Sequence, residues 1–186
     1  MKVTTTPLEG VLIIETPTFG DERGWFTENF NQQKFAKAVG KDVTFVQDNH
    51  SRSARGVLRG IHFQTGDAAQ GKLVRATAGE IFDVAVDLRK SSPTFGQWFG
   101  ITLSAENKKQ LWVPAGFGHA FLVTSDMAEV QYKVDAYWLP EHERSLRWDD
   151  AEIGIEWPRV TGISLSDKDR DAVSLSGLLK AEGLFE

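Results

Sequence analysis

Apolar and polar residues alternate along much of the middle of the chain, which is the pattern of strands that bury one face. The clearest case is IFDVAVDL at residues 81–88, in which Phe82 and the alternate apolar residues after it share one side, opposite Asp83 and Asp87. The preceding segment, residues 72–80, has the same alternation and ends in an Ala-Gly-Glu turn. We therefore expect these two segments to form a hairpin.

Further segments with the same alternation follow along the chain. Residues 97–116 predict two short strands around a polar Ser-Ala-Glu-Asn connection, and residues 119–126 and 127–138 predict another pair joined by a Ser-Asp turn. Helical patterns are confined to residues 30–39 and 171–179. Strands at this density predict an all-β fold, either a sandwich or a barrel, with a few short flanking helices.

Size and composition are those of an ordinary globular protein. The 186 residues contain no repeat, low-complexity run or Pro/Gly/Ser linker, so we expect a single domain over residues 1–186. Cysteine is absent, which excludes disulfides and thiolate metal ligands and is consistent with a reducing cytoplasm. The net charge of -5 argues against general nucleic-acid binding. Because no apolar run is long enough for a membrane span or a signal-peptide core, we expect a cytoplasmic protein with neither nucleic acid nor membrane as a partner.

Two short motifs carry the first candidate chemistry. The segment GVLRGIHFQ, residues 56–64, places His62 in the middle of a strand, where an aliphatic residue would be easier to bury. The segment VPAGFGHAF, residues 113–121, has the pattern P-x-G-x-x-H and resembles the second motif of the cupin superfamily, in which a Pro-Gly turn brings a histidine, here His119, into the mouth of a jelly-roll barrel. Taken separately, a packed core histidine and an ordinary hairpin turn would also explain these motifs.

The first cupin motif would fall on residues 56–64, and its residues argue against a metal centre. Metal-binding cupins use H-x-H followed by a glutamate, whereas this chain has His62, Phe63 and Gln64, and the next acid, Asp67, lies in a glycine-containing loop. Two imidazoles fall short of the three protein ligands of a catalytic zinc or iron site. We therefore expect a site without metal or cofactor, in which the histidines act as acid–base groups.

Acid–base chemistry also needs a proton donor, a cation for developing negative charge and a carboxylate that orients the imidazole. Tyr132 alternates with two valines and would share their inward face. Lys72 opens a strand on the side of its apolar residues, where burial is unfavourable unless the lysine meets an anion. Asp169 lies in the polar segment LSDKDRD, residues 165–171. Taken singly, a structural tyrosine, an exposed strand-end lysine and a solvated loop would explain the three residues.

Several longer segments together resemble one family, the dTDP-4-dehydrorhamnose 3,5-epimerases of nucleotide-sugar biosynthesis. The resemblance extends from about Gly20 to Asp169 and rests on DERGWFTENF, QDNHSRSARGVLRGIHFQ, KLVRATAGEIFDVAVDLRKSSPTFG, VPAGFGHAF, QYKVDAYWLPEHERSLRWDD and LSDKD. It implies a double-stranded β-helix (cupin jelly roll), usually a homodimer that completes its sites with a swapped N-terminal segment. It also implies epimerisation of dTDP-4-dehydro-6-deoxy-D-glucose at carbons 3 and 5, which gives dTDP-4-dehydro-L-rhamnose in dTDP-L-rhamnose biosynthesis.

By this resemblance, His62 is the general base, Asp169 its orienting carboxylate and Tyr132 the acid on the opposite face of the sugar. The keto group at carbon 4 acidifies the hydrogens at carbons 3 and 5, and removal of either gives an enolate that Lys72, helped by His119, would stabilise. The resemblance implies substrate-binding roles for Arg23, Glu28, Gln47, Asn49, Arg59, Lys72, His119, Trp138, Glu143 and Lys168.

Two local features qualify this interpretation. Arg59 and His62 would face opposite sides of an ideal strand, so we expect a bulge or local twist at Gly60 that turns both toward one ligand. Trp138 follows Tyr137 where many family members carry tandem tyrosines. An indole can still stack on a base, but it has no phenol, which leaves the extent of epimerisation open.

Three alternatives stay open. One is a single-centre epimerase or ketoisomerase that acts on another dTDP-4-keto sugar, since such relatives share the core motifs. Another is a metal-dependent cupin such as a dioxygenase. The third is a non-catalytic sugar-binding or regulatory cupin, against which the joint presence of His62, Tyr132 and Asp169 counts.

Overall fold

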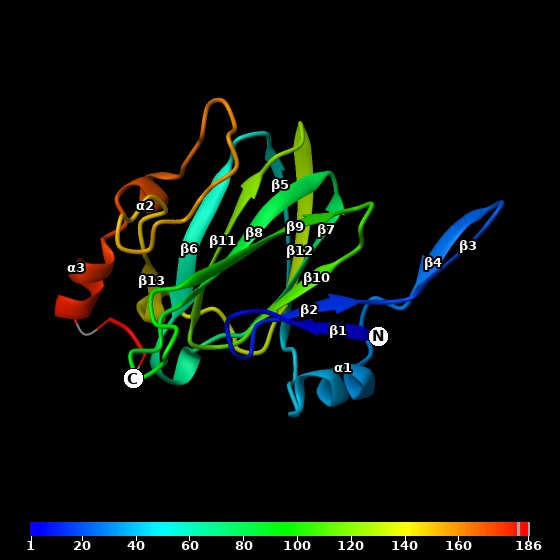
Figure 1. The fold of residues 1–186 in the computed structure, drawn as a ribbon, viewed down its shortest axis with the longest axis horizontal. Coiled ribbons are helices and arrows are strands. Elements are labelled where there is room, and N and C mark those ends of the chain that lie inside the picture. The colour runs from blue at the N-terminus through cyan, green and yellow to red at the C-terminus, as the bar shows by residue number, and fades with distance from the viewer. Residues whose placement is uncertain (182, 186) are drawn as a thin grey trace.

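The computed structural model describes residues 1–181 and 183–185 and contains two antiparallel sheets that face each other (Figure 1). The six-stranded sheet has the order β1 (Lys2–Thr5), β2 (Leu12–Glu15), β10 (Gln110–Val113), β7 (Lys72–Ala78), β12 (Met127–Val134) and β5 (Gln47–Ala54). The five-stranded sheet has the order β13 (Glu143–Ser145), β6 (Leu58–Gln64), β11 (Phe117–Val123), β8 (Glu80–Asp87) and β9 (Trp98–Ser104). The all-β prediction is confirmed, whereas the assignment of residues 1–186 to a single domain stays a prediction.

Consecutive strands lie in opposite sheets at most connections, and the hairpin predicted for residues 72–80 and 81–88 is therefore wrong. β7 pairs with β10 and β12, whereas β8 pairs with β9 and β11. Residues 119–126 and 127–138 likewise do not pair, because β11 and β12 belong to different sheets. Gly79 turns the chain between sheets at a φ of 64°, and a Cβ there would lie 1.9 Å from the carbonyl oxygen of Met127. From β5 to β13 the chain changes sheet at every connection except that between β8 and β9, as in a jelly roll.

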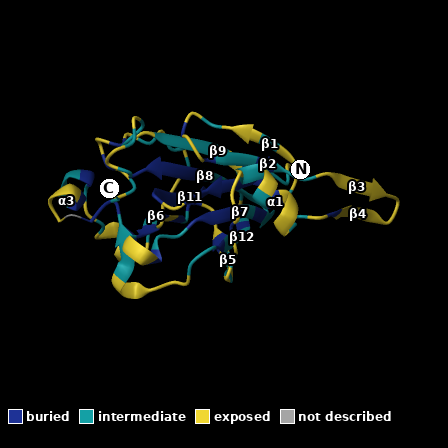
Figure 2. Cartoon of the chain, turned by 90° about the horizontal axis from the view of Figure 1, so that it is seen from below, coloured by how far each residue is buried: buried dark blue, intermediate teal, exposed yellow. Residues whose placement is uncertain are grey.

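The core between the sheets is built from the inward side chains of both. Val74 of β7 and Leu111 of β10 meet Ala85 of β8 and Phe121 of β11 in one apolar cluster, and all four are buried. In Figure 2 the strands β7, β8 and β11 form the buried middle of the molecule. This apolar layer determines how far apart the two sheets lie.

Both faces of β8 are buried, which the alternation of residues 81–88 did not predict. Its inward face meets the core between the sheets, and on its outer face Val84 and Val86 pack with Leu146 and other residues from the C-terminal part of the chain. Asp83 and Asp87 alternate with Ala85 on the inward face and are 0% exposed. A carboxylate in such a place requires partners.

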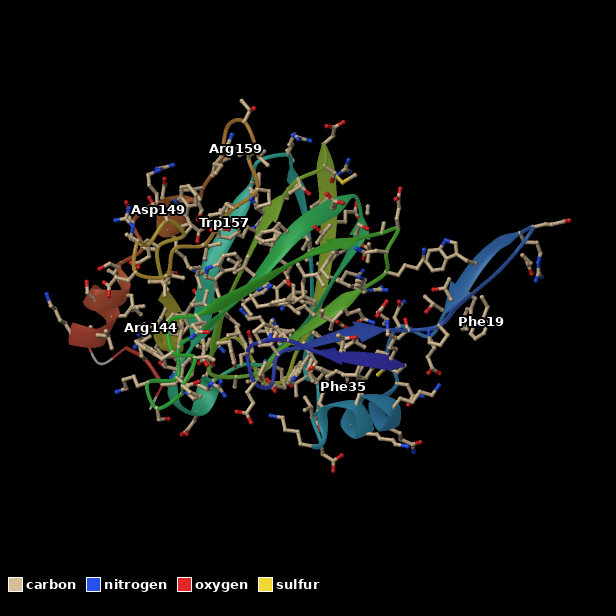
Figure 3. All side chains as sticks on the ribbon, viewed as in Figure 1. Phe19, Phe35, Arg144, Asp149, Trp157 and Arg159 are labelled. Atoms are coloured by element: carbon tan, nitrogen blue, oxygen red, sulfur yellow. The ribbon has the colours of Figure 1, made fainter. Side chains whose placement is uncertain are left out.

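The helix α1 (Gln32–Val39) covers the outer face of the six-stranded sheet and confirms the first predicted helix. Asn31 caps it by accepting a hydrogen bond from the backbone amide of Lys34. Figure 3 shows Phe35 on the sheet-facing side of α1, and its ring packs edge-on against Trp112 with centroids 5.3 Å apart. The amphipathic face of the helix is thus used to close this side of the barrel.

The remaining helices are short. The helix α3 (Leu175–Lys180), capped by Ser174, corresponds to the helical pattern in the tail. The helix α2 (Asp167–Arg170) and the 3-10 turns η1 (Gly66–Ala68) and η2 (Pro140–His142) were not predicted. Among the helices that the structure describes, none combines the length and apolar character needed to cross a membrane.

A two-stranded hairpin of β3 (Thr18–Asp21) and β4 (Gly24–Thr27) projects from the barrel (Figure 1). Within the described part of the chain its strands pair only with each other. Phe19, Trp25 and Phe26 are 61–69% exposed, and Figure 3 shows Phe19 on this arm, away from the barrel. An isolated hairpin is marginally stable in water, and exposed aromatic clusters mark surfaces that bind something.

Candidate active site

A polar cavity of about 320 Å³ lies between the two sheets. Its lining comes from β5, β6, β7, β12 and β13, from the loop before β7 and from the segment after β12: Gln47, Asn49, His62, Phe63, Gln64, Gln70, Lys72, Tyr132, Trp138 and Glu143. Seven of the predicted site residues are therefore neighbours of one another around a single space, although they are separated by up to about a hundred positions in sequence.

His62 on β6 is held by Asp169 of α2. The imidazole Nε2 and the carboxylate Oδ1 lie 2.5 Å apart, and the other carboxylate oxygen accepts a hydrogen bond from Ser166 Oγ at 2.8 Å. Asp169 accepts a hydrogen bond from the Nε2–H of the neutral ring. The Nδ1 atom therefore has a free lone pair that can accept a proton. The dyad joins residues 107 positions apart in the chain.

The pKa values of His62 and Asp169 are both shifted in the direction that favours a neutral imidazole beside an ionised carboxylate. Burial lowers the pKa of the His62 imidazole below its ordinary value, and the attraction of Asp169 offsets this only in part. Burial alone would raise the pKa of Asp169, but the hydrogen bonds from His62 and Ser166 outweigh it and hold that pKa below its usual range. At neutral pH the pair is therefore an uncharged imidazole beside a carboxylate.

The expected irregularity at Gly60 is present and lies between the phosphate and base candidates. His62 is opposite His119 of β11, but Arg59 is opposite Phe121, so the register shifts within β6. Gly60 has a φ of 117°, and a Cβ there would lie 2.5 Å from the carbonyl oxygen of His119. Arg59 Nε donates a hydrogen bond to Ser53 Oγ of β5 at 3.2 Å, which directs the arginine across toward the six-stranded sheet.

Lys72 points inward, as its strand position predicted. It is 8% exposed, and its Nζ donates a hydrogen bond to the backbone carbonyl of His62 at 3.3 Å. Burial lowers the pKa of this ammonium to about 8, although the negative charges of Glu143 and Asp83 act in the opposite direction. The cation is thus present at neutral pH in a site where an anionic oxygen would be a favourable partner.

Tyr132 faces the same cavity from β12, in the sheet opposite that of His62. Burial raises the pKa of its phenol, Glu143 raises it further, and the positive charge of Arg59 lowers it. The net increase keeps the hydroxyl protonated over the physiological range. A base on one sheet and a proton donor on the other can reach opposite faces of a flat intermediate between them.

His119 lies behind the cavity in a second histidine–aspartate pair. Its Nε2 atom is 2.8 Å from Asp83 Oδ1, and its ring centroid is 6.5 Å from that of Tyr132. The other carboxylate oxygen, Asp83 Oδ2, is buried without a hydrogen-bond partner among the described residues. The sequence interpretation missed Asp83. The available signal was a carboxylate in an otherwise apolar strand, on the same face as Ala85.

Further predicted residues line the outer part of the cavity or pair with its lining. Lys168 Nζ and Glu143 Oε1 form an ion pair at 2.6 Å, and the backbone amide of Trp138 donates to Gln47 Oε1 at 3.4 Å. Trp138 is 53% exposed, so one face of its ring is free to stack. Gln47 Nε2 in turn donates a hydrogen bond to Asn49 Oδ1 at 2.9 Å.

Two predicted residues, Arg23 and Glu28, are not brought to this cavity. Arg23 sits in the turn of the projecting hairpin and pairs with Asp21, while Glu28 pairs with Lys34 of α1 at 2.7 Å. Neither residue lines the cavity described above, and Arg59 and Lys168 also lie outside its lining. Within one chain the predicted set is therefore incomplete on the side of the nucleotide.

The described part of the chain contains no cluster of side chains with the composition of a metal site. No group of three or more His, Cys, Asp or Glu side chains among residues 1–181 and 183–185 is arranged to hold an ion. His62 and His119 are each occupied by a carboxylate through Nε2. Gln64 occupies the position of the second histidine of metal-binding cupins, and its side-chain amide is used by the backbone instead.

Comparison with known proteins identifies the family. The family model described as dTDP-4-dehydrorhamnose 3,5-epimerase matches residues 5–177. A protein of that name from Pseudomonas aeruginosa is 59% identical over 170 residues, which cover 91% of this chain and 93% of the relative. The crystal structure of dTDP-6-deoxy-D-glucose-3,5-epimerase from Legionella pneumophila in complex with dTDP-4-keto-L-rhamnose is similar at a TM-score of 0.95 and 48% identity, over 100% of this chain and 97% of that one.

A relative with a narrower reaction shares the fold. A 3'-monoepimerase from Streptomyces bikiniensis, solved in complex with dTDP-quinovose, is similar at a TM-score of 0.92 and 35% identity, over 96% of this chain and 90% of that one. The structural relatives bear out the cupin jelly roll, and the family match extends over most of the chain. The chain therefore belongs to the dTDP-4-dehydrorhamnose 3,5-epimerase family, a family of isomerases.

Proposed function

We propose that this protein converts dTDP-4-dehydro-6-deoxy-D-glucose into dTDP-4-dehydro-L-rhamnose by inverting carbons 3 and 5 through an enolate. One observation carries the mechanism. His62, which is paired with Asp169, lines the cavity from one sheet, and Tyr132 lines it from the other. This arrangement supports removal of a proton from one face of the sugar and its return from the other. The membership of the family supports a role in dTDP-L-rhamnose biosynthesis.

Each inversion proceeds in two proton transfers. His62 Nδ1 takes a proton from the carbon next to the ketone, the electron pair of that C–H bond forms a carbon–carbon double bond, and the carbonyl π electrons move to the oxygen, which becomes an enolate. The ammonium of Lys72, with His119 nearby, stabilises that oxygen. The phenol of Tyr132 then donates a proton to the carbon from the opposite face, and solvent restores both protonation states. The substrate's own ketone supplies the acidity that the reaction needs.

The nucleotide half of the substrate would lie along the outer part of the cavity. Arg59 has a planar guanidinium, which suits the diphosphate oxygens, and Gln47 and Asn49 offer amides. Trp138 presents a large exposed ring for the thymine. Lys168 and Glu143, paired in the free protein, lie where the sugar meets the diphosphate.

Incubation with dTDP-4-dehydro-6-deoxy-D-glucose in deuterium oxide tests this proposal. We expect deuterium at both carbon 3 and carbon 5, and an L-rhamno product that a downstream 4-ketoreductase consumes, with the same rate after treatment with a chelator. Exchange at carbon 3 alone would favour the single-centre alternative, for which the Streptomyces bikiniensis relative is a precedent. Loss of activity with the chelator would reject the metal-free mechanism.

The pKa directions predict a bell-shaped dependence of kcat/KM on pH. The neutral form of His62 is the base, and its lowered pKa puts the acid limb below the ordinary histidine value of about 6.5. Lys72 is useful only while charged, so activity should fall again as pH rises through about 8. The variant Lys72→Met should have a much lower rate and no limb near this pH. An alkaline limb that persists in that variant would belong to another group.

We further propose that the protein is a homodimer in which the β3–β4 hairpin completes the site of the second copy. The hairpin carries Arg23 away from its own cavity and exposes Phe19, Trp25 and Phe26, and Glu28 follows directly after it. A partner surface would cover the aromatic side chains and would give Arg23 an anionic ligand.

Subunit mixing tests this arrangement. We expect His62→Asn and Arg23→Ala to be impaired alone, but a refolded equimolar mixture to regain about a quarter of wild-type activity, since half of the dimers are mixed and each has one intact site. Wild-type protein refolded in the same way is the control. If both residues act within one chain, mixing cannot restore activity beyond the sum of the two variants.

A further inference from the structure

Gln64 is the last residue of β6 and is almost completely buried at 3% exposure. Its side-chain amide bonds only to backbone groups: Nε2 donates to the carbonyl oxygens of Ala68 at 2.8 Å and Tyr137 at 3.0 Å, and Oε1 accepts from the amide of Leu139 at 2.7 Å. Both amide hydrogens and one oxygen lone pair are therefore used. A side chain placed in this way joins three separate backbone positions into one unit.

The segment joined by Gln64 is residues 137–143, which we call the rim segment. It carries Trp138 near one end and Glu143 at the other, and both line the cavity. Gln64 reaches the first end through its side chain and the second through its backbone, because Glu143 is its strand partner in β13. One residue thus fixes both ends of the segment that forms the outer wall of the site.

The chemistry of this contact is specific to an amide. Exchange of the nitrogen and oxygen positions would place the NH2 group against the Leu139 amide and the oxygen against two carbonyls, so the three partners define the orientation. Glutamate has the same shape but would place a carboxylate oxygen against those carbonyl oxygens. Methionine has similar length and bulk but would leave all three backbone groups without this partner.

The position of the residue separates it from proton transfer. His62 lies two residues earlier in β6 and takes its orientation from Asp169, with which Gln64 forms no hydrogen bond. Lys72 and Tyr132 lie on strands of the opposite sheet. A change at Gln64 should therefore move the outer wall of the cavity and leave the proton-transfer residues in place.

We propose that Gln64 is a positioning residue that sets the rim segment for the nucleotide part of the substrate. The inference deepens the proposed function and rests on it, since Trp138 and Glu143 act on a dTDP-sugar only if the cavity binds one. Gln64 occupies the strand position at which metal-binding cupins have their second histidine, and the inference assigns this position a structural role. The amide at this position organises a binding wall through the backbone and does not supply a ligand.

The test compares Gln64→Met and Gln64→Glu with wild type for dTDP affinity by calorimetry, for kcat and KM, and for hydrogen exchange at the Leu139 amide. We expect dTDP affinity to weaken and KM to rise on the order of 10- to 100-fold while kcat changes less than about threefold, with a larger effect for glutamate. The Leu139 amide should exchange faster in both variants. This separation of KM from kcat is not expected of a general loss of stability.

Asp150→Asn is the matched control. Asp150 is also buried and also binds backbone amides, those of Glu152, Ile153 and Leu175, but it does not line the cavity. The control should lower Tm and leave dTDP affinity and KM unchanged. Gln64→Met, without a new charge, keeps the test available if the glutamate variant does not fold.

Failure of the inference about Gln64 can be distinguished from failure of the proposed epimerase function. Wild-type protein that binds dTDP but does not epimerise the keto sugar would reject the function, while dTDP affinity in the variants would still decide the role of Gln64. Unchanged dTDP affinity together with faster Leu139 exchange would overturn the inference alone. An equal fall in kcat and kcat/KM, with KM constant, would also overturn it, because the residue would then act on the chemical step.

Discussion

His62→Asn should abolish deuterium exchange at both carbon 3 and carbon 5, with a loss in kcat of at least about 10³-fold, because it removes the imidazole that acts as the base in the proposed mechanism. Asparagine is polar and smaller than histidine, so it can keep a hydrogen bond to Asp169 without creating an unpaired buried charge. The dissociation constant for dTDP should change little, since the imidazole acts on the sugar ring. Product NMR in deuterium oxide measures the first effect, and calorimetry with dTDP the second.

His50→Asn is the matched control for this change. His50 lies on β5, where its Nε2 atom pairs with Glu129 at 3.1 Å, and it does not line the cavity. We expect its exchange rates to stay within about threefold of wild type. If His62→Asn still exchanged deuterium at the wild-type rate, the base would have to be another residue, and the proposed mechanism would be rejected.

Tyr132→Phe should separate the two proton transfers. The phenyl ring keeps the packing of β12, so His62 can still remove a proton and solvent can still return one to the same face. Deuterium should therefore appear in recovered substrate of unchanged configuration, while formation of the inverted product falls by about 10²- to 10⁴-fold. The measurement is the ratio of exchange to inversion at each carbon by NMR.

The chain provides a direct control, because Tyr137 is its other tyrosine. That side chain is 64% exposed and does not line the cavity, so Tyr137→Phe removes a phenol outside the proton path. We expect both exchange and inversion to remain near wild type. Product of normal stereochemistry formed at the normal rate by Tyr132→Phe would show that another group returns the proton.

The sequence predicted the strands well but not their partners. Alternation identified residues 81–88 as a strand and its two faces, yet it could not say that β8 would be covered on both sides, so the partner of Asp83 was not foreseen. Partner choice depends on turns such as that at Gly79, whose path is determined by contact with Met127 in a distant strand. The aromatic side chains of the projecting hairpin follow the pattern of buried residues and gave no sign of their exposure.

The candidate site was predictable where local sequence is sufficient. The inward direction of Lys72 and Tyr132 follows from alternation, and the irregularity at Gly60 follows from the spacing of Arg59 and His62. The contact of His62 with Asp169 could be inferred only from the resemblance to a family, because 107 positions separate the two residues. Gln64 was read only as a missing metal ligand, since a side chain that bonds to the backbone of distant loops leaves no local pattern.

The division of the site between two sheets makes the reaction depend on the thickness of the apolar layer that separates them. Facing sheets pack about 10 Å apart, a spacing set by the bulk of interdigitating side chains. A change deep in this layer touches no reacting atom, yet it alters the gap that a flattened sugar must bridge between deprotonation and reprotonation. The fraction of product with the inverted configuration should therefore depend on packing in the hydrophobic core. Substitutions that disturb this packing should lower that fraction before they unfold the protein.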